Sequence, residues 1–190
     1  MKEIRTAEIR TDSADEGLTL VGTPIVFDTP TMIHDIFGDY TEIIKRSALA
    51  DTDLNDTHLL YNHDLNKVPL ARTPKTMKLE KTPNGINMRA SLPETETGKE
   101  IYAAVKRQDL SGMSFAFKVP KGGDEYDAET NTRTINKIEK LYEVSLTPFP
   151  AYPQTSVEAR SQIEGTWNKL KDPKRKELKI KVNQILKRGM

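Results

Sequence analysis

The sequence contains no cysteine, and this absence removes several classes of chemistry. Disulfide bonds, thiolate nucleophiles and cysteine-based zinc sites are excluded. No apolar run reaches the ~18 residues that a membrane-spanning helix needs. The first residues, MKEIRTAEIR, carry charges throughout and have no signal-peptide core. We therefore expect a soluble, intracellular protein without a membrane partner, a metal or another cofactor.

The charges of the chain are unevenly distributed. The net charge is +1, but residues 159–190 hold ten Lys or Arg against three Asp or Glu, giving +7 there and −6 in residues 1–158. Helical apolar periodicity in the basic part predicts two domains: a body at 1–158 and a basic helical C-terminal tail at 159–190. Such a tail could dock on an acidic surface or be a solvated appendage. With an acidic body and only 6% aromatic residues, a nucleic-acid binder is not favoured.

Short apolar stretches, punctuated by 11 prolines and 10 glycines, predict a β-rich fold. About seven short strands with flanking helices predict a closed or nearly closed β-barrel. Asn84-Gly85 predicts a hairpin turn. Thr97 and Glu100 form a capping-box pattern that predicts a helix ending near Gln108. A second short helix is expected from Ser47, and a polar loop at residues 122–132.

Ser114 is the candidate nucleophile within a predicted strand at residues 110–119. Its bulky neighbours Met113 and Phe115 point to one face, whereas Ser114 and Ala116 point to the other. A serine held in this way presents little except its hydroxyl to the facing surface. This suits a nucleophile, because its oxygen must approach a carbonyl in a fixed direction. The commoner role of such a serine is structural, with its hydroxyl bonded to a strand carbonyl.

A serine hydroxyl needs a base, and His63 is the candidate at the predicted end of a strand. A third group must orient the imidazole, and Glu143, Glu139 and Asp64 are the candidates. Glu143 is favoured because it lies in a predicted strand that could run beside the serine strand. Ser111 competes with Ser114 as nucleophile, but its position after the helix is more typical of a turn or cap.

Several motifs in fixed order make the sequence resemble the prohead (procapsid) maturation proteases of HK97-like tailed phages. The resemblance runs through most of residues 18–155. It shows in the segments LTLVGTPIVFDTPT, LLYNHDLNKVPLART, ETETGKEIYAAVKRQDLSGMSFAFKV and IEKLYEVSLTPFPAYPQT.

The resemblance implies a β-barrel with flanking helices similar to herpesvirus assembly proteases, and a serine endopeptidase. By position, the histidine of NHD is His63, the serine of GMSFAF is Ser114, and the acidic residue of EVS is Glu143. Ala71 stands where family members often have glycine before the arginine, which weakens any role for Arg72 in binding the oxyanion. Backbone amides at residues 149–152 are a guess for the oxyanion donors.

The resemblance also implies where the enzyme acts and on what. The expected substrate is the scaffolding segment of the major capsid protein, together with the protease itself, inside an immature capsid in the host cytoplasm. The chain could also self-associate. The substrate-binding residues are unknown from the sequence.

Two other functions are weighed against this one. A non-catalytic capsid assembly or scaffolding protein could keep the same fold. A metal-dependent hydrolase could use His58 and His63, but their spacing matches no common zinc motif. An odd offset along a strand would also place these histidines on opposite faces.

Overall fold

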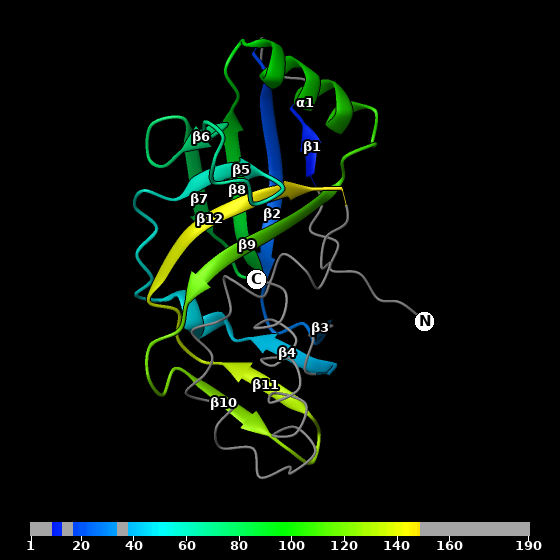
Figure 1. Cartoon of the computed structure of the whole chain (residues 1–190). Coiled ribbons are helices and arrows are strands. Elements are labelled where there is room, and N and C mark those ends of the chain that lie inside the picture. Colours follow the sequence, from blue (N-terminus) through cyan, green and yellow to red (C-terminus); the bar gives the residue numbers. More distant parts are fainter. Residues whose placement is uncertain (1–8, 13–16, 34–37, 149–190) are drawn as a thin grey trace, which may run out of the picture.

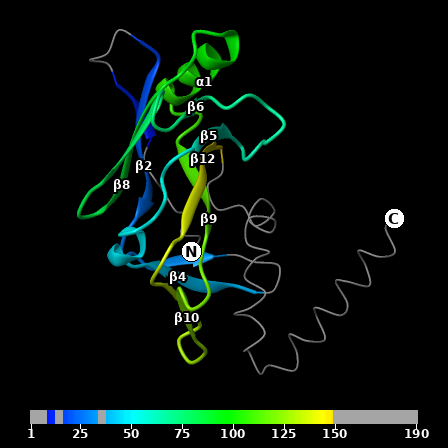
Figure 2. The same cartoon turned by 90° about the vertical axis from the view of Figure 1, so that its left-hand side faces the viewer.

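The computed structural model describes residues 9–12, 17–33 and 38–148, which form twelve β-strands, one α-helix and one short 3-10 helix. The strands make three four-stranded sheets. Figures 1 and 2 show two of these sheets facing each other in the upper part of the molecule, with the third below them. Among the described helices, none has the length and apolar character needed to cross a membrane.

The first sheet has the order β1-β2-β8-β7, with all neighbours antiparallel. Its strands are β1 (Ile9–Thr11), β2 (Thr19–Val26), β7 (Met77–Lys81) and β8 (Gly85–Ser91). Along β8, Ile86, Met88 and Ala90 are buried and alternate with exposed residues, as the sequence predicts for one core-facing side. The predicted hairpin joins β7 to β8, but its turn lies at residues 82–85, without a positive φ at Asn84 or Gly85. Gly85 itself belongs to β8 and pairs with Val26.

Gly85 lies where β2 and β8 approach closely. A Cβ at this position would stand 2.0 Å from the Ile25 carbonyl oxygen, so the two strands would have to separate. We expect Gly85→Ala to lower the free energy of unfolding by about 1–3 kcal/mol, measured by urea denaturation. At Gly17 a Cβ would meet nothing within 4 Å, so Gly17→Ala is the matched control. Equal midpoints for the two variants would contradict the prediction.

The second sheet has the order β6-β5-β12-β9 and contains the candidate catalytic residues. Its strands are β5 (His58–Tyr61), β6 (Ala71–Arg72), β9 (Gly112–Lys118) and β12 (Lys140–Thr147). β12 runs parallel to β5 and antiparallel to β9, and lies between them. As a central strand, β12 is buried on both faces: Val144 and Leu146 on one, Glu143 and Ser145 on the other.

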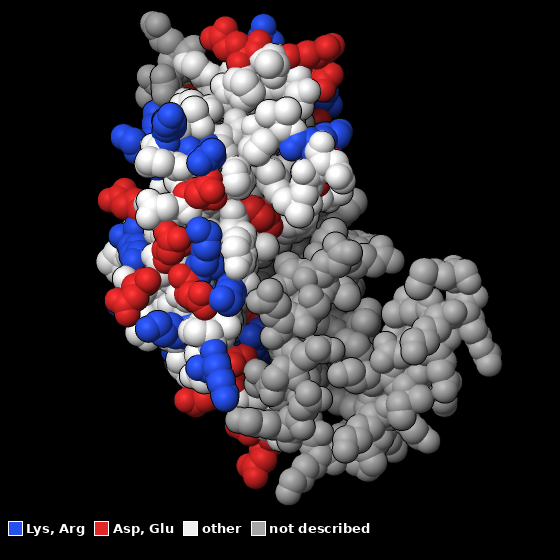
Figure 3. Space-filling model, turned by 60° about the vertical axis from the view of Figure 1, so that its left-hand side comes forward, with Lys and Arg blue, Asp and Glu red and all other residues white. Residues whose placement is uncertain are grey.

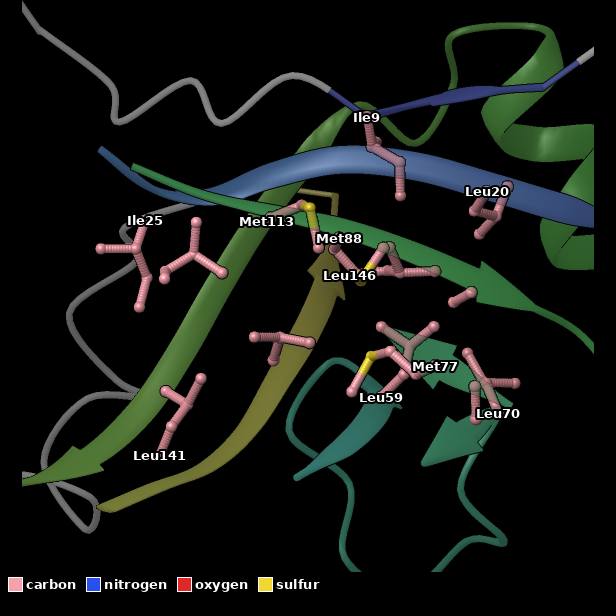
Figure 4. Packing of buried hydrophobic residues seen from close by; sticks show 14 of the residues in the cluster. Ile9, Leu20, Ile25, Leu59, Leu70, Met77, Met88, Met113, Leu141 and Leu146 are labelled. Carbon is pink, nitrogen blue, oxygen red and sulfur yellow. The ribbon is translucent and has the colours of Figure 1, made fainter. Parts of the chain in front are cut away.

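The hydrophobic core lies between these two sheets. Met88 of the first sheet meets Met113 and Leu146 of the second, and Leu20 and Leu59 belong to the same cluster (Figure 4). The α-helix α1 (Glu96–Lys106) adds the buried residues Ile101 and Val105 to this core. Burying side chains of this kind contributes about 1.5–3 kcal/mol each, so the core holds the second sheet firmly against the first.

The third sheet is organised around a buried arginine. Its order is β10-β11-β4-β3, from β3 (Thr31–Ile33), β4 (Tyr40–Ile44), β10 (Asp124–Asp127) and β11 (Thr132–Ile135). The Arg133 guanidinium donates to Asp124 at 2.8 Å and to Glu42 at 3.0 Å. Burial by itself would lower the pKa of Arg133, but the two carboxylates raise it above its usual value. One guanidinium is thus shared between two buried carboxylates inside the sheet.

Ion pairs on the surface contribute less to stability than the core does. On the face in Figure 3, Lys and Arg side chains are interspersed with Asp and Glu over the described part, without a large area of one sign. One pair joins Lys140 Nζ to Asp53 Oδ2 at 2.9 Å, and this hydrogen bond lowers the pKa of Asp53. Exposed pairs of this kind contribute little to stability.

The predicted closed barrel is wrong, because all three sheets are open within the described residues. β6 and β7 follow one another and touch, yet the first and second sheets do not join there. β6 has only two residues and is followed by Pro74, which has no N–H to extend a ladder. The number of strands is also larger than the seven predicted.

Three local predictions need correction. Thr95, not Thr97, caps α1, and its side chain accepts the Gly98 N–H. The helix expected from Ser47 is only a 3-10 turn at Arg46–Leu49. The expected loop at residues 122–132 contains β10 and ends at the first residue of β11; the polar β10 lacks the apolar alternation by which the sequence predicts a strand. The predicted tail at 159–190, and the domain boundary at 158, lie outside the described residues.

Candidate active site

His63 lies in a tight turn immediately after β5. The φ angles of Asn62 and His63 are 53° and 57°, and the Asp64 N–H donates to the Tyr61 carbonyl at 3.1 Å. Positive φ at both central residues is typical of a type I′ turn. Asparagine adopts a positive φ readily, whereas most other residues avoid it. The turn ends the strand and directs the imidazole back over the sheet.

The imidazole of His63 contacts a carboxylate from the neighbouring strand. His63 Nδ1 lies 2.7 Å from Glu143 Oε1, and the two side chains are only 17% and 7% exposed. Partial burial keeps water from competing for this hydrogen bond. Because Glu143 accepts at Nδ1, the Nδ1–H tautomer is the one that fits, and Nε2 is left with its lone pair.

Ser114 lies on the same face of the sheet as Glu143. In the register of β9 against β12, Ser114 stands opposite Ser145 and Ala116 opposite Glu143. Residues opposite each other in an antiparallel pair share a face, with Cα atoms about 4.5–5.5 Å apart. Ser114 is half-buried, whereas its neighbour Met113 points into the core, as the alternation predicts.

Ser145 is a part of this site that sequence reasoning missed. Its hydroxyl donates to Glu143 Oε2 at 2.5 Å and accepts the main-chain N–H of His63 at 3.2 Å. The only sequence signal was its place two residues after Glu143 on one strand, which put both on one face. That signal could not show that His63 would reach them.

Comparison with known proteins decides the family. The family model described as caudovirus prohead serine protease matches residues 5–169. The chain belongs to this family. A curated relative, the prohead protease of Enterobacteria phage HK97, is 27% identical over 158 residues, which cover 81% of this chain and 68% of that protein. The resemblance drawn from the motifs is therefore confirmed.

The family makes this chain a serine protease with a role in capsid maturation, not a non-catalytic scaffolding protein. No solved structure matches the chain significantly. The expected likeness to herpesvirus proteases therefore has no support from a structural match.

In this prohead protease, the other two candidates for the third group lie elsewhere. Glu139 pairs with Lys118 at 2.8 Å on the surface. The Asp64 carboxylate accepts the Asn66 N–H at 2.9 Å within its own turn. Of the three candidate carboxylates, only Glu143 thus contacts His63 within the described residues.

Arg72 is also held away from Ser114. It pairs with Asp56, and it lies on β6, which is separated from β9 by β5 and β12. Three strand spacings of about 4.8 Å separate the two backbones. This position does not favour Arg72 as an oxyanion donor. The amides guessed for that role, at residues 149–152, lie outside the described residues.

Within the described part of the chain, His58 and His63 form no metal site with nearby carboxylates. His58 is paired in register with Glu143, so it lies on the same face as the residue that His63 contacts. The expectation of opposite faces for His58 and His63 is wrong, because the strand ends at Tyr61 and the turn reverses the direction of His63. Even so, no group of three potential metal ligands is found among the described residues.

Proposed function

We propose that Ser114 is the nucleophile, His63 the general base and Glu143 the orienting carboxylate of an endopeptidase that cleaves the scaffolding segment of the major capsid protein. One observation carries the assignment. The 2.7 Å contact between His63 Nδ1 and Glu143 Oε1 forms on the sheet face where Ser114 stands opposite Ser145. A base held by a carboxylate, next to an accessible serine, is the arrangement that acyl transfer requires.

The chemistry follows from this arrangement. Ser114 Oγ attacks the scissile carbonyl carbon while His63 Nε2 takes the hydroxyl proton, and the carbonyl oxygen becomes an oxyanion. The C–N bond then breaks, and His63 gives the proton to the leaving amine, which leaves an acyl-serine. Water attacks this ester with His63 again as base, and the acid product departs with the Ser114 hydroxyl restored.

Glu143 contributes by orienting and by charge. Its hydrogen bond fixes the imidazole in the Nδ1–H tautomer, so that Nε2 is free to accept the serine proton. Its negative charge stabilises the imidazolium that forms. In the described residues no hydrogen bond joins Ser114 Oγ to the His63 ring. Such contacts are often long before substrate binds and shorten in the enzyme–substrate complex.

The family supports our proposal for the place and the substrate. The relative from phage HK97 is named a prohead protease, and we propose that this chain likewise acts inside the procapsid in the host cytoplasm. There it would remove the scaffolding segment of the capsid protein before DNA enters, and also cut itself. The basic residues 159–190 fit a segment that docks on the shell interior or is removed by self-cleavage.

Co-expression with the capsid protein of the same phage tests the substrate. We expect the capsid protein to lose an N-terminal segment and the protease its basic tail, both seen by mass spectrometry of assembled particles. EDTA in the purified reaction should leave cleavage unchanged, because the proposed mechanism uses no metal. Capsid protein expressed alone controls for host proteases. An uncut capsid protein beside folded protease would refute the substrate, and an intact tail would refute self-removal.

A further inference from the structure

We infer that Ser145 is a positioning residue: its hydroxyl orients the Glu143 carboxylate and fixes the turn that carries His63. This inference rests on the proposed function, because Ser145 would act through Glu143 and His63 without touching substrate. It adds a fourth residue to the three that the sequence suggested.

Both hydrogen-bonding capacities of the Ser145 hydroxyl are used within the site. It has one proton to donate, which goes to Glu143 Oε2 at 2.5 Å. It accepts the His63 N–H at 3.2 Å. One hydroxyl thus connects the carboxylate to the main chain of the residue that the carboxylate orients.

The effect on Glu143 is to define the rotation of its carboxylate. The terminal torsion of a glutamate is broad and would otherwise let either oxygen face the imidazole. With Oε2 held by Ser145, Oε1 is left for His63 Nδ1, at 2.7 Å. Preorganisation of this kind raises the rate because no reorientation is needed when charge develops on the imidazole.

The effect on His63 is to stabilise an uncommon backbone conformation. The β5–β12 ladder continues for one more step, with the Asn62 N–H donating to the Leu146 carbonyl at 2.9 Å. At the next residue the chain turns, with a His63 φ of 57°, and a side-chain hydroxyl replaces the main-chain acceptor. Without Ser145 this N–H would lose its partner in a partly buried place, which disfavours the turn conformation.

Burial argues against Ser145 as the nucleophile. Its exposed fraction is 0%, whereas Ser114, directly opposite on β9, is half-buried. A substrate carbonyl cannot reach a fully buried oxygen. The Ser145 proton is also directed to a carboxylate, and an imidazole is the base that serine attack needs. The two serines at one register therefore have different roles.

A double-mutant cycle with a fluorophosphonate probe tests the role of Ser145. We expect Ser145→Ala to slow the maximal rate of covalent labelling by about 10- to 100-fold, with unchanged probe affinity. Glu143→Gln should slow labelling more. In the Glu143→Gln background, Ser145→Ala should add less than about 3-fold, because both changes remove the same orientation of His63. Losses that multiply would overturn the inference.

Control variants separate positioning from stability. Thr52 also has a buried hydroxyl, which donates to the Ile138 carbonyl at 2.8 Å away from the site, so Thr52→Val should be destabilised but label at the wild-type rate. If Ser145→Ala does not fold, Ser145→Cys keeps the shape of the side chain, with a somewhat larger and weaker donor, and should still be slowed about 10-fold. Wild-type labelling of a folded Ser145 variant overturns the inference. Labelling of Ser114→Ala at the wild-type rate would instead refute the proposed nucleophile.

Discussion

Replacing Ser114 by alanine is expected to lower capsid-protein cleavage by about four to six orders of magnitude while the fold remains intact. The change removes the atom that forms the acyl bond in the proposed mechanism, and a water in its place would not have the fixed direction of approach. The side chain is half-buried and forms no hydrogen bond within the described residues, so its loss should cost little stability. The measurement is the rate of cleavage of purified capsid protein, with the melting temperature as a check of folding.

Ser111→Ala is the matched control for this prediction. Ser111 precedes β9 by one residue and is exposed, so its variant should cleave at a rate close to wild type. The two serines are close in sequence and differ in whether they face the His63–Glu143 pair. Equal cleavage by Ser114→Ala and wild type would show that another group is the nucleophile.

Replacing Arg133 by methionine is expected to have the largest effect on stability. The variant would leave the carboxylates of Glu42 and Asp124 buried without their cation, since the three side chains are 0–6% exposed. Removing one partner of a buried ion pair costs about 3–5 kcal/mol. For a protein of this size, that corresponds to a fall in melting temperature of roughly 6–20 °C.

An exposed arginine provides the comparison. Arg107 pairs with Asp109 at 3.0 Å, and its side chain is 76% exposed, so Arg107→Met should change the free energy of unfolding by no more than about 1 kcal/mol. Adding Glu42→Leu to Arg133→Met should recover part of the lost stability, because one uncompensated charge is removed. Similar melting temperatures for the two arginine variants would show that the buried network contributes nothing.

Local patterns predicted several elements correctly. The alternation in β8 and β9, the hairpin that joins β7 to β8 and the strands at His58–Tyr61 and Tyr40–Ile44 each depend on side chains close in sequence. β10 and the start of β11 were missed because these residues are polar: Arg133 is buried there by pairing with carboxylates, not among apolar side chains. The barrel was wrong because strand count says nothing about which edges pair.

The candidate site, like the fold, was predicted from the sequence only in part. Sequence reasoning identified His63, Ser114 and Glu143 but left Glu139 and Asp64 open as orienting groups. Only the structure distinguishes them, since it places the Glu143 carboxylate on the His63 ring. Ser145 escaped notice because its importance depends on the turn at Asn62 and His63, where two positive φ angles reverse the chain.

By itself, the amino-acid sequence determined the enzyme family, the absence of thiol chemistry and the short-range alternation that sets which face each side chain takes. Tertiary structure alone decided that the second sheet has the order β6-β5-β12-β9, and thereby which polar groups meet. His63 and Glu143 are 80 residues apart, so their contact depends on how strands pair. Strand pairing is a long-range choice, governed by the burial of the whole sheet and by turn geometry, and no local pattern encodes it.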